Sequence, residues 1–252
     1  MKFALANGRR EEAQPGLSGE CPQCGNALVA KCGERRAQHW AHKGQRRCDP
    51  WWENETAWHR GWKDEFASAW QEVVQRADDG ERHIADVKTA HGWVIEFQHS
   101  YITPDERRSR NAFYGRLIWV LNGHRRKRDA TQFANAYSRG VTMGAFRRVL
   151  SEGCAMLEEW GDTSAPTLID FGGDELWWLL GRAADGATYI LRYSRAAFVE
   201  THRGATTDLV QQFDSFVAGI PKQISDGELF LRLQHQASRQ MVLAPRRRSP
   251  RL

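Results

Sequence analysis

Hydrophobic and polar side chains alternate with a period of two along residues 83–100, on both sides of a glycine-containing break centred at His91. This alternation, with β-branched and aromatic residues in both halves, predicts a β-hairpin. A turn centred at His91 places Asp86 directly opposite Glu96. Because successive side chains point to opposite faces of a strand, Asp86, Glu96 and Gln98 share one face. The side chains expected on the core-facing side are Trp93, Ile95 and Phe97.

A period of three to four residues precedes the hairpin, along residues 51–76, and predicts an amphipathic helix. A polar stripe of Glu55, His59 and Lys63 runs about 100° around this helix from the apolar stripe. At that position the polar side chains either lean over the neighbouring sheet or form an ordinary i,i+4 array on the surface. The apolar stripe comprises Trp58, Trp62, Phe66, Trp70 and Val73.

A second helix is expected directly after the hairpin. Thr103 suits the N-cap and Pro104 the first turn, and two acidic residues follow at the positive end of the helix dipole. The segment 116–122, which is apolar at every position from Leu117 to Leu121, then predicts a buried strand. From residue 51 onward the expected order is therefore helix, strand, strand, helix, strand.

The remainder of the chain mixes both patterns. Two apolar runs on either side of Gly172 and Gly173 predict another hairpin. Asp170 and Asp174 lie beside it, and turn chemistry explains them better than metal binding. Further elements are expected as a helical region at 130–160, a strand at 187–193, and helices at 194–202, 209–217 and 226–240.

The pairing of Asp86 with Glu96 is chemically informative, because like charges opposite each other destabilise a sheet. A divalent cation would offset the repulsion. Mg²⁺ takes one or two protein carboxylates and completes its octahedron with waters and phosphate oxygens. The hairpin therefore indicates a metal site of the kind that nucleases use. A surface hairpin with both acids on its solvated face would show the same alternation.

Taken together, these segments resemble the CoiA-like competence proteins, a family of the PD-(D/E)XK nuclease superfamily. The resemblance covers roughly residues 20–125 and rests on several short motifs. The residues that carry it are Glu55–Lys63, Ala85–Val87, Ile95–Ser100, Arg110 and Tyr114.

The resemblance implies roles for individual residues. Asp86 and Glu96 match the acids that bind Mg²⁺ or Mn²⁺, and the backbone carbonyl of Phe97 matches a usual third ligand. Glu55 matches an acid that the first core helix often supplies. Gln98 stands where the superfamily has a lysine. A glutamine carries no charge and accepts no proton, but it can orient the attacking water or contact the scissile phosphate.

A second group of candidate ligands lies near the N-terminus. Cys21 and Cys24, followed by Gly25, have zinc-knuckle spacing, and two further ligands would complete a tetrahedron. Five cysteines in a chain without a secretory signal argue against a disulfide framework. Reduced thiols without a ligand, or a redox pair, are the alternatives. The candidates for the second pair are Cys32, His39, His42 and Cys48.

CoiA-like proteins carry a similar segment, and this similarity favours Cys21, Cys24, His39 and His42 as the zinc ligands. The H-x-x-H spacing is tight for two ligands unless the backbone turns there. Cys48 is therefore the alternative fourth ligand. Cys154 is isolated and is expected to be a small buried residue.

The formal net charge is +5, but basic residues concentrate at 105–129 and in a tail at 246–252. Such clusters are the electrostatic footprint of a phosphate-backbone partner, although a solvated charged face gives the same pattern. The candidate DNA-contacting residues are Arg107, Arg108, Arg110, Tyr114, Arg125, Arg126, Lys127 and Arg128.

We therefore expect an α/β chain that hydrolyses DNA phosphodiesters. Asp86 and Glu96 would hold Mg²⁺ or Mn²⁺, Gln98 would orient the water, and Glu55 would assist. The alternative is a DNA-binding recombination or uptake factor without hydrolysis, and an RNA- or protein-binding adaptor is least favoured. The expected divisions are a zinc-ribbon-like module at 1–50, a PD-(D/E)XK nuclease-like core (helix, mixed sheet, helix) at 51–202, a helical region at 203–245 and the basic tail at 246–252.

Location and partners follow from composition and charge. The first ten residues have too little apolar character for a signal peptide, and no apolar run approaches the ~20 residues of a membrane span. A cytoplasmic protein is expected, with single- or double-stranded DNA as its partner and recombination or defence proteins as further candidates.

Overall fold

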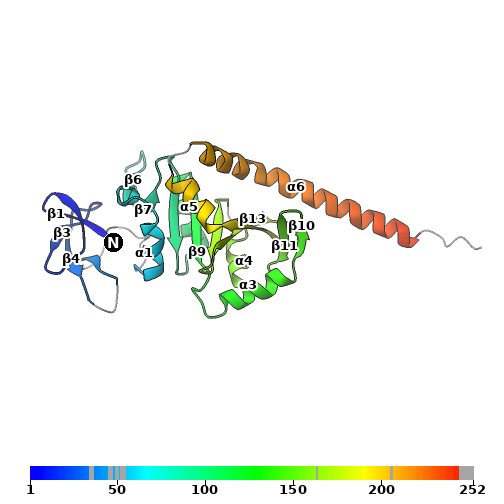
Figure 1. Ribbon diagram of the computed structural model, residues 1–252, viewed down its shortest axis with the longest axis horizontal. Helices are drawn as coiled ribbons and strands as arrows, with labels where there is room; N and C mark the ends of the chain where they lie inside the picture. The colour runs from blue at the N-terminus through cyan, green and yellow to red at the C-terminus, as the bar shows by residue number, and fades with distance from the viewer. Residues whose placement is uncertain are drawn as a thin grey trace, which may run out of the picture.

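The computed structural model describes residues 1–33, 37–44, 48, 51, 55–162, 164–204 and 207–243, of which residue 230 and residues 232–243 are described by their backbone alone. Over these residues the chain forms two sheets and a set of helices (Figure 1), which confirms the predicted mixed α/β class. The expected basic tail at 246–252 lies outside the described residues.

The larger sheet has nine strands within the described residues. The pairs β8–β9 and β9–β12 are parallel, and the other neighbours are antiparallel. Its order is β10 (Val141–Met143), β11 (Phe146–Leu150), β14 (Ala187–Ser194), β13 (Glu175–Arg182), β12 (Thr167–Asp170), β9 (Leu117–Asn122), β8 (Val94–Gln98), β7 (Arg82–Lys88) and β6 (Gln71–Arg76).

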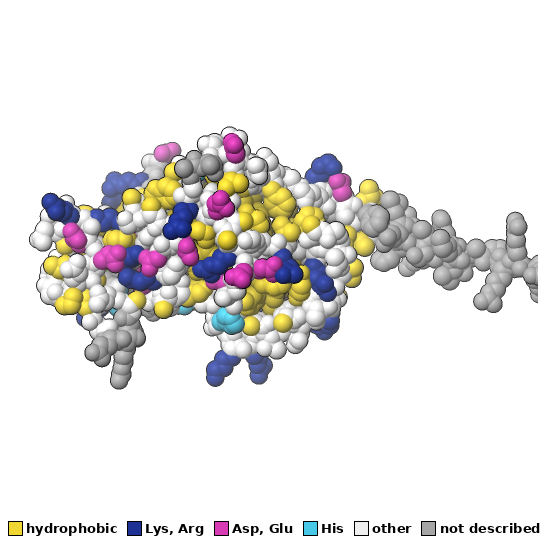
Figure 2. Space-filling model, in the orientation of Figure 1, with side chains coloured by type: hydrophobic (Ala, Val, Ile, Leu, Met, Phe, Trp, Pro, Cys, Tyr) yellow, Lys and Arg dark blue, Asp and Glu magenta, His cyan; other side chains and the backbone are white. Residues whose placement is uncertain are grey.

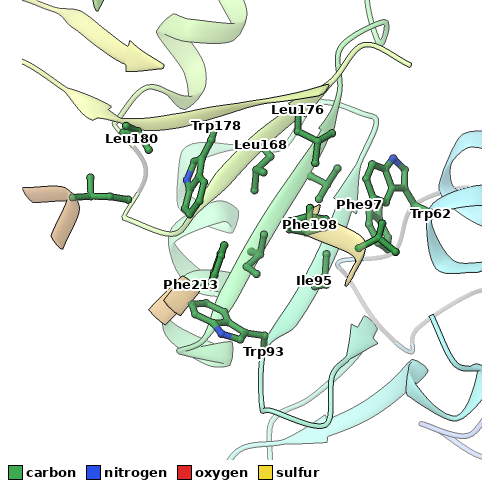
Figure 3. Packing of buried hydrophobic residues seen from close by; sticks show 14 of the residues in the cluster. Trp62, Trp93, Ile95, Phe97, Leu168, Leu176, Trp178, Leu180, Phe198 and Phe213 are labelled. Atoms are coloured by element: carbon green, nitrogen blue, oxygen red, sulfur yellow. The ribbon is translucent and has the colours of Figure 1, made fainter. Parts of the chain in front are cut away.

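Helices cover both faces of this sheet. On one face, Trp62 of α1 (Ala57–Asp64) stacks against Phe97, and Phe198 of α5 (Arg195–Arg203) packs beside them (Figure 3). Phe213 of α6 (Thr207–Leu243) stacks on Trp178 farther along the same face. The other face is covered by α2 (Pro104–Tyr114), α3 (Asp129–Ser138) and α4 (Ala155–Trp160).

Burial on both faces explains the sequence of β9. Ile118 and Val120 belong to the core under α1, whereas Leu117, Trp119 and Leu121 belong to the core under α3 and α4. A strand enclosed by two helical layers needs apolar residues at every position rather than at alternate ones. The continuous apolar run at 117–121 is the sequence signature of that position, and the buried strand predicted over 116–122 is confirmed.

Asp170 fixes α1 to the end of β12. Its Oδ2 accepts hydrogen bonds from Trp58 Nε1 and Trp62 Nε1, both at 2.8 Å, and its Oδ1 accepts one from the backbone of Gly172 at 2.7 Å. The last bond is the turn chemistry that the sequence predicted. The two tryptophan bonds, across more than a hundred residues, also hold the helix against the sheet.

The single helix predicted over residues 51–76 is wrong. Thr56 caps α1, whose eight residues end at Asp64; a 3₁₀ turn (η1, Ser68–Trp70) and strand β6 follow. The β-branched pair Val73–Val74 joins the ladder with β7, so tertiary pairing outweighs the helical spacing. Trp58, Trp62, Phe66 and Trp70 pack against the core as predicted, but Phe66, Trp70 and Val73 lie beyond the end of the helix.

The helical prediction for residues 130–160 is correct only at its two ends. Helices α3 and α4 are separated there by the hairpin of β10 and β11, whose turn contains Gly144 with φ +61°. A positive φ suits glycine, so the chain can reverse direction here. The predicted helix was wrongly continued through this turn. The structure confirms the hairpins at 83–100 and 167–180, the strand at 187–193 and the helix at 194–202. The two helices predicted at 209–217 and 226–240 are parts of one helix, α6.

The smaller sheet contains five strands among the described residues, in the order β2 (Arg9–Glu12), β1 (Phe3–Ala6), β3 (Ser18–Glu20), β4 (Ala27–Lys31) and β5 (His39–His42). Its core is small and includes Ala4, Leu28 and Trp40. In the described part of the chain, no helix is both long and apolar enough to cross a membrane.

Glu72 joins the two sheets. Its Oε1 accepts hydrogen bonds from the Lys2 backbone at 2.6 Å and from Lys63 Nζ at 2.7 Å, and its Oε2 accepts one from the Phe3 backbone at 2.9 Å. Burial alone would raise the pKa of Glu72, but Lys63 lowers it well below its usual range. The carboxylate therefore holds the start of β1 against the larger sheet. Its backbone is left-handed, with φ +46°.

His202 gives a prediction for acid stability. Burial among aromatic rings lowers the pKa of this side chain from 6.5 to about 3, an effect that Asp214 partly opposes. The unfolded chain therefore binds a proton that the folded chain does not bind as pH falls below about 6.5. This contribution to stability is complete above that pH and is lost toward pH 3, by up to about 1.4 kcal/mol per pH unit. His202→Phe should flatten the pH dependence of the unfolding free energy over this range, measured by urea denaturation; an unchanged slope would contradict it.

Candidate metal centre and adjoining acidic pocket

Four ligand atoms gather at one end of the smaller sheet. One atom each from Cys21, Cys24, His42 and Cys48 lies within 4.8 Å of the others. The Sγ atoms of Cys21 and Cys48 are 3.5 Å apart, and Cys24 Sγ lies 3.4 Å from His42 Nε2. Adjacent ligands of tetrahedral zinc lie about 3.5–3.8 Å apart. The geometry and the thiolate-rich donor set both fit a zinc ion.

The chain turns tightly between the first two ligands. The backbone N–H of Cys21 donates to Asn26 O at 2.9 Å, and that of Gly25 donates to Cys21 O, also at 2.9 Å. Gly25 has φ +72°, which allows the reversal directly after Cys24. This local turn aims both thiols at the same point and accounts for the spacing seen in the sequence.

His39 does not join this cluster, which corrects the ligand set favoured from sequence. His39 and His42 lie three residues apart on strand β5, so their side chains point to opposite faces. His42 shares its face with the buried Trp40, whereas His39 Nδ1 lies 2.8 Å from Ala37 O. Cys48, the alternative named from the sequence, takes the fourth position.

The acidity of the thiols is consistent with a site that forms on metal binding. Burial raises the pKa of Cys21 and of Cys48. For Cys24 burial acts in the same direction, but the backbone N–H of Asn26 and the neighbouring thiols bring its pKa below the usual value. Because zinc binds thiolates, it must displace these protons, and its affinity falls as the pH is lowered.

A cavity of about 50 Å³ adjoins the cluster and contains the acids predicted from the hairpin. This volume accommodates a few water-sized groups. We call it the acidic pocket. His42 and Cys48 line it on one side, so the cysteine–histidine cluster and the hairpin acids share a wall. The remaining lining residues are Met1, Trp51, Glu55, His59, Lys63, Glu72, Ile84, Asp86, Glu96, Phe97, Gln98 and Arg110.

Asp86 and Glu96 meet where β7 and β8 separate. The ladder pairs Val87 with Ile95, and the same register places Asp86 opposite Glu96, as predicted. Beyond that point the carboxylates replace backbone partners: Phe97 N–H donates to Asp86 Oδ2 at 3.0 Å and Asp86 N–H donates to Glu96 Oε1 at 3.3 Å. Both acids are thereby fixed at the wall of the acidic pocket.

Each acid has a basic neighbour, which offsets the repulsion expected from the sequence. His59 Nε2 lies 2.8 Å from Asp86 Oδ2, and Arg110 Nη1 lies 3.2 Å from Glu96 Oε2. Burial raises the pKa of Asp86, but His59 and then Lys63 lower it, and the net shift is downward. Asp86 is therefore a carboxylate at neutral pH. Sequence reasoning named His59 on the polar stripe but did not pair it with Asp86.

Lys63 lies between two further carboxylates and is almost fully buried. Its Nζ donates to Glu55 Oε2 at 2.9 Å and to Glu72 Oε1 at 2.7 Å. Burial alone would lower the pKa of Lys63, but Glu72 and Glu55 raise it above its usual value. The stripe Glu55–His59–Lys63 thus leans over the sheet, although Glu55 precedes the helix. Glu72 was not singled out from the sequence, because no local pattern marks its contact with Lys63.

Gln98 is buried and lines the acidic pocket, and its Nε2 donates to Ser100 O at 3.2 Å. Trp51 closes another side: its carbonyl accepts a bond from Arg110 Nη2 at 2.6 Å, and its ring stacks on His83 with centroids 3.2 Å apart. Trp51 follows Cys48 by three residues. Cys48, a candidate zinc ligand, is thus close in sequence to the residue that contacts Arg110, the partner of Glu96.

Most of the arginines expected to contact DNA have internal partners. Arg107 pairs with Asp162, and Arg125 and Arg126 both pair with Glu159. Arg108 is exposed but pairs with Asp105. Acidic and basic side chains are interspersed on the face shown in Figure 2. Lys127 and Arg128 are exposed beside α3, Arg110 faces the acidic pocket, and Tyr114 packs near the Trp51 ring.

Comparison with known proteins gives two partial similarities. The family model described as "Competence protein CoiA, N-terminal domain" matches residues 18–50. The competence protein CoiA of Bacillus subtilis (strain 168) is 28% identical over 126 residues, which cover 45% of this chain and 34% of the relative. The matched region thus spans about a third of that relative's length. No solved structure matches. Both similarities support the CoiA-like relationship expected from the motifs.

The ligand geometry predicts one zinc ion per chain, held by Cys48 rather than by His39. Purified under reducing conditions, the protein should contain about one equivalent of zinc by elemental analysis. Cys48→Ser should lose most of it, because a tetrahedral site then lacks a thiolate. His39→Ala, the matched control on the same strand as His42, should retain it. Zinc retained by Cys48→Ser and lost from His39→Ala would reverse this assignment.

Proposed function

We propose that this chain is a divalent-metal-dependent deoxyribonuclease of the CoiA-like, PD-(D/E)XK type. The observation that carries the proposal is the meeting of Asp86 and Glu96 across a hairpin, in a pocket that also contains Gln98. Two carboxylates held opposite each other in one cavity repel each other, and a bound cation would offset this repulsion.

The charges of the pocket fit a divalent cation. Four carboxylates line it, whereas Lys63 and Arg110 are its permanently charged bases. The carboxylates outnumber these two bases, and a divalent ion would offset the remaining negative charge. Oxygen donors of this kind suit Mg²⁺ and Mn²⁺. The four acids are Glu55, Glu72, Asp86 and Glu96.

The chain's own residues would divide the work as follows. Asp86 and Glu96 would hold the cation, directly or through a bound water, and the cation would acidify a water and stabilise charge on the phosphate. Gln98, whose amide lines the same pocket, orients the attacking water. Glu55 acts through Lys63, because its carboxylate holds the ammonium group at 2.9 Å beside the acids. The backbone carbonyl of Phe97, directly after Glu96 in sequence, would add an oxygen donor.

Relatedness to a competence protein supports DNA as the substrate. The name of the Bacillus subtilis relative links it to competence, and the proposed reaction would act on DNA in that context. A cytoplasmic location and recombination or defence proteins as partners belong to the same proposal.

A second candidate is a DNA-binding uptake or recombination factor that does not hydrolyse DNA. The observation that favours it is the internal neutralisation of the acids, since His59 lies against Asp86 and Arg110 against Glu96. The replacement of the superfamily's lysine by Gln98 points the same way. In this case the pocket would be a structural ion-pair network, and DNA binding would not depend on a divalent metal.

Cleavage assays distinguish the two candidates. With Mg²⁺ or Mn²⁺ the wild-type protein should degrade plasmid, linear or single-stranded DNA, and Asp86→Asn or Glu96→Gln should reduce the rate by at least about 100-fold. Both variants should bind DNA nearly as well as wild type, because the acids make no attractive contact with phosphate. Asp174→Asn, an acid in a turn outside the pocket, is the matched control and should cleave normally. Full activity in Asp86→Asn would exclude the proposed metal site.

The exposed basic residues beside α3 predict how DNA is held. Replacing Lys127 and Arg128 together by Ser should weaken binding to unrelated sequences alike. It should also flatten the dependence of log K on log salt by about 0.7–0.9 for each phosphate that the protein no longer neutralises. Lys222→Ser, which removes an exposed charge from α6, should leave the slope unchanged. A wild-type slope near zero would argue against any phosphate-backbone interface.

A further inference from the structure

His59 lies in the wall of the acidic pocket, and the proposed nuclease function assigns it no role. Its imidazole is 5% exposed, and Nε2 is 2.8 Å from Asp86 Oδ2. Within the described part of the chain, neither ring nitrogen has a partner with good hydrogen-bond geometry. His59 Nε2 is thus close to Asp86 Oδ2, but the two atoms are poorly aligned for a hydrogen bond.

This arrangement is typical of two ligands of one cation. Adjacent ligands of a six-coordinate ion at about 2.1 Å lie about 3 Å apart, and their lone pairs converge on the ion instead of on each other. The observed 2.8 Å is within a few tenths of an ångström of that separation. A short contact that is poorly aligned as a hydrogen bond is therefore explained if both atoms face a shared ion.

We propose that His59 Nε2 is a ligand of the same divalent cation as Asp86 Oδ2 and that it makes the pocket prefer Mn²⁺ to Mg²⁺. The inference rests on the proposed nuclease function and names the metal that this function would use. Imidazole nitrogen suits transition metals, whereas Mg²⁺ is bound mainly through oxygen. With His59 as a ligand, Mn²⁺ gains a bond that Mg²⁺ accepts poorly.

The fold positions His59 for this role. Thr56 caps α1, and its hydroxyl accepts a bond from the backbone of His59 at 3.1 Å. One residue before His59 and three after it, Trp58 and Trp62 are both fixed by Asp170. The imidazole is thus supported on a rigid element whose position does not depend on the metal.

Glu96 is placed differently from this pair. Within the part of the chain that the structure describes, the ligand atoms of His59, Asp86 and Glu96 do not all lie within 4.8 Å of one another. The cysteine–histidine cluster does meet this criterion. Glu96 is engaged by Arg110. We therefore assign the direct bonds to His59 and Asp86, with Glu96 acting through a water.

Electron paramagnetic resonance tests the assignment without depending on activity. The zinc-loaded full-length chain is titrated with Mn²⁺, free Mn²⁺ is counted from its signal, and echo modulation from bound ¹⁴N is recorded. Wild-type protein should bind about one Mn²⁺ with ¹⁴N modulation, and at least about tenfold more tightly than Mg²⁺ in competition. His59→Ala should lose the modulation and most of this preference, while Mg²⁺ affinity changes less.

Two variants control for folding and for other histidines. His99→Ala removes an imidazole whose ring centroid lies 6.5 Å from that of His59, and it should keep the modulation. His59→Gln retains a polar side chain of similar length, so it should unfold at a temperature near that of wild type and still lose the modulation. Zinc content, measured in parallel, excludes Mn²⁺ at the cysteine–histidine cluster.

The possible failures are distinguishable. Bound Mn²⁺ without ¹⁴N modulation, or modulation that survives in both His59 variants, overturns the inference while divalent-dependent cleavage leaves the nuclease proposal intact. Equal affinity for Mn²⁺ and Mg²⁺ overturns the stated preference. Failure of the wild-type protein to bind either ion, together with an absence of cleavage, overturns both proposals.

Discussion

The buried ion pair between Lys63 and Glu72 is the contact on which the arrangement of this molecule depends. It joins helix α1 to the start of β6. Glu72 also accepts hydrogen bonds from the backbone N–H groups of Lys2 and Phe3, where β1 begins. Removing one partner of such a pair costs about 3–5 kcal/mol, because the other charge is left buried without compensation. The carboxylate of Glu72 thus contacts the helix α1 and the start of β1 from its own strand in the larger sheet.

The two candidate metal centres are parts of one structure rather than neighbouring sites. His42 and Cys48 face the acidic pocket from the N-terminal module, and Asp86 and Glu96 face it from the hairpin. The carbonyl of Trp51 accepts a hydrogen bond from Arg110, which pairs with Glu96. The module has only a small apolar core, so an ion bound by its cysteines and His42 would add to its order.

Local patterns predicted much of this correctly. The register that places Asp86 opposite Glu96 follows from alternation and a turn, and the cap at Thr103 follows from residue types alone. The helix over 51–76 failed because the spacing of apolar residues continued into β6, whose partner strand no local window contains. Sequence alone could not decide between His39 and His42 as ligands, because the choice depends on both residues lying on one strand, β5. Glu72 and Asp170 were missed as anchors because their partners are remote in sequence.

At Glu72 the local backbone conformation and the tertiary contacts favour different residues. At φ +46° the main chain would be more relaxed with glycine, and a residue with a Cβ in this conformation stores on the order of 1 kcal/mol of strain. Glycine, however, would leave Lys63 and the two N–H groups of β1 without their acceptor. The position is thus locally frustrated. A substitution that relieves the strain at this position therefore dismantles the junction, although the proposed chemistry does not directly use the Glu72 side chain.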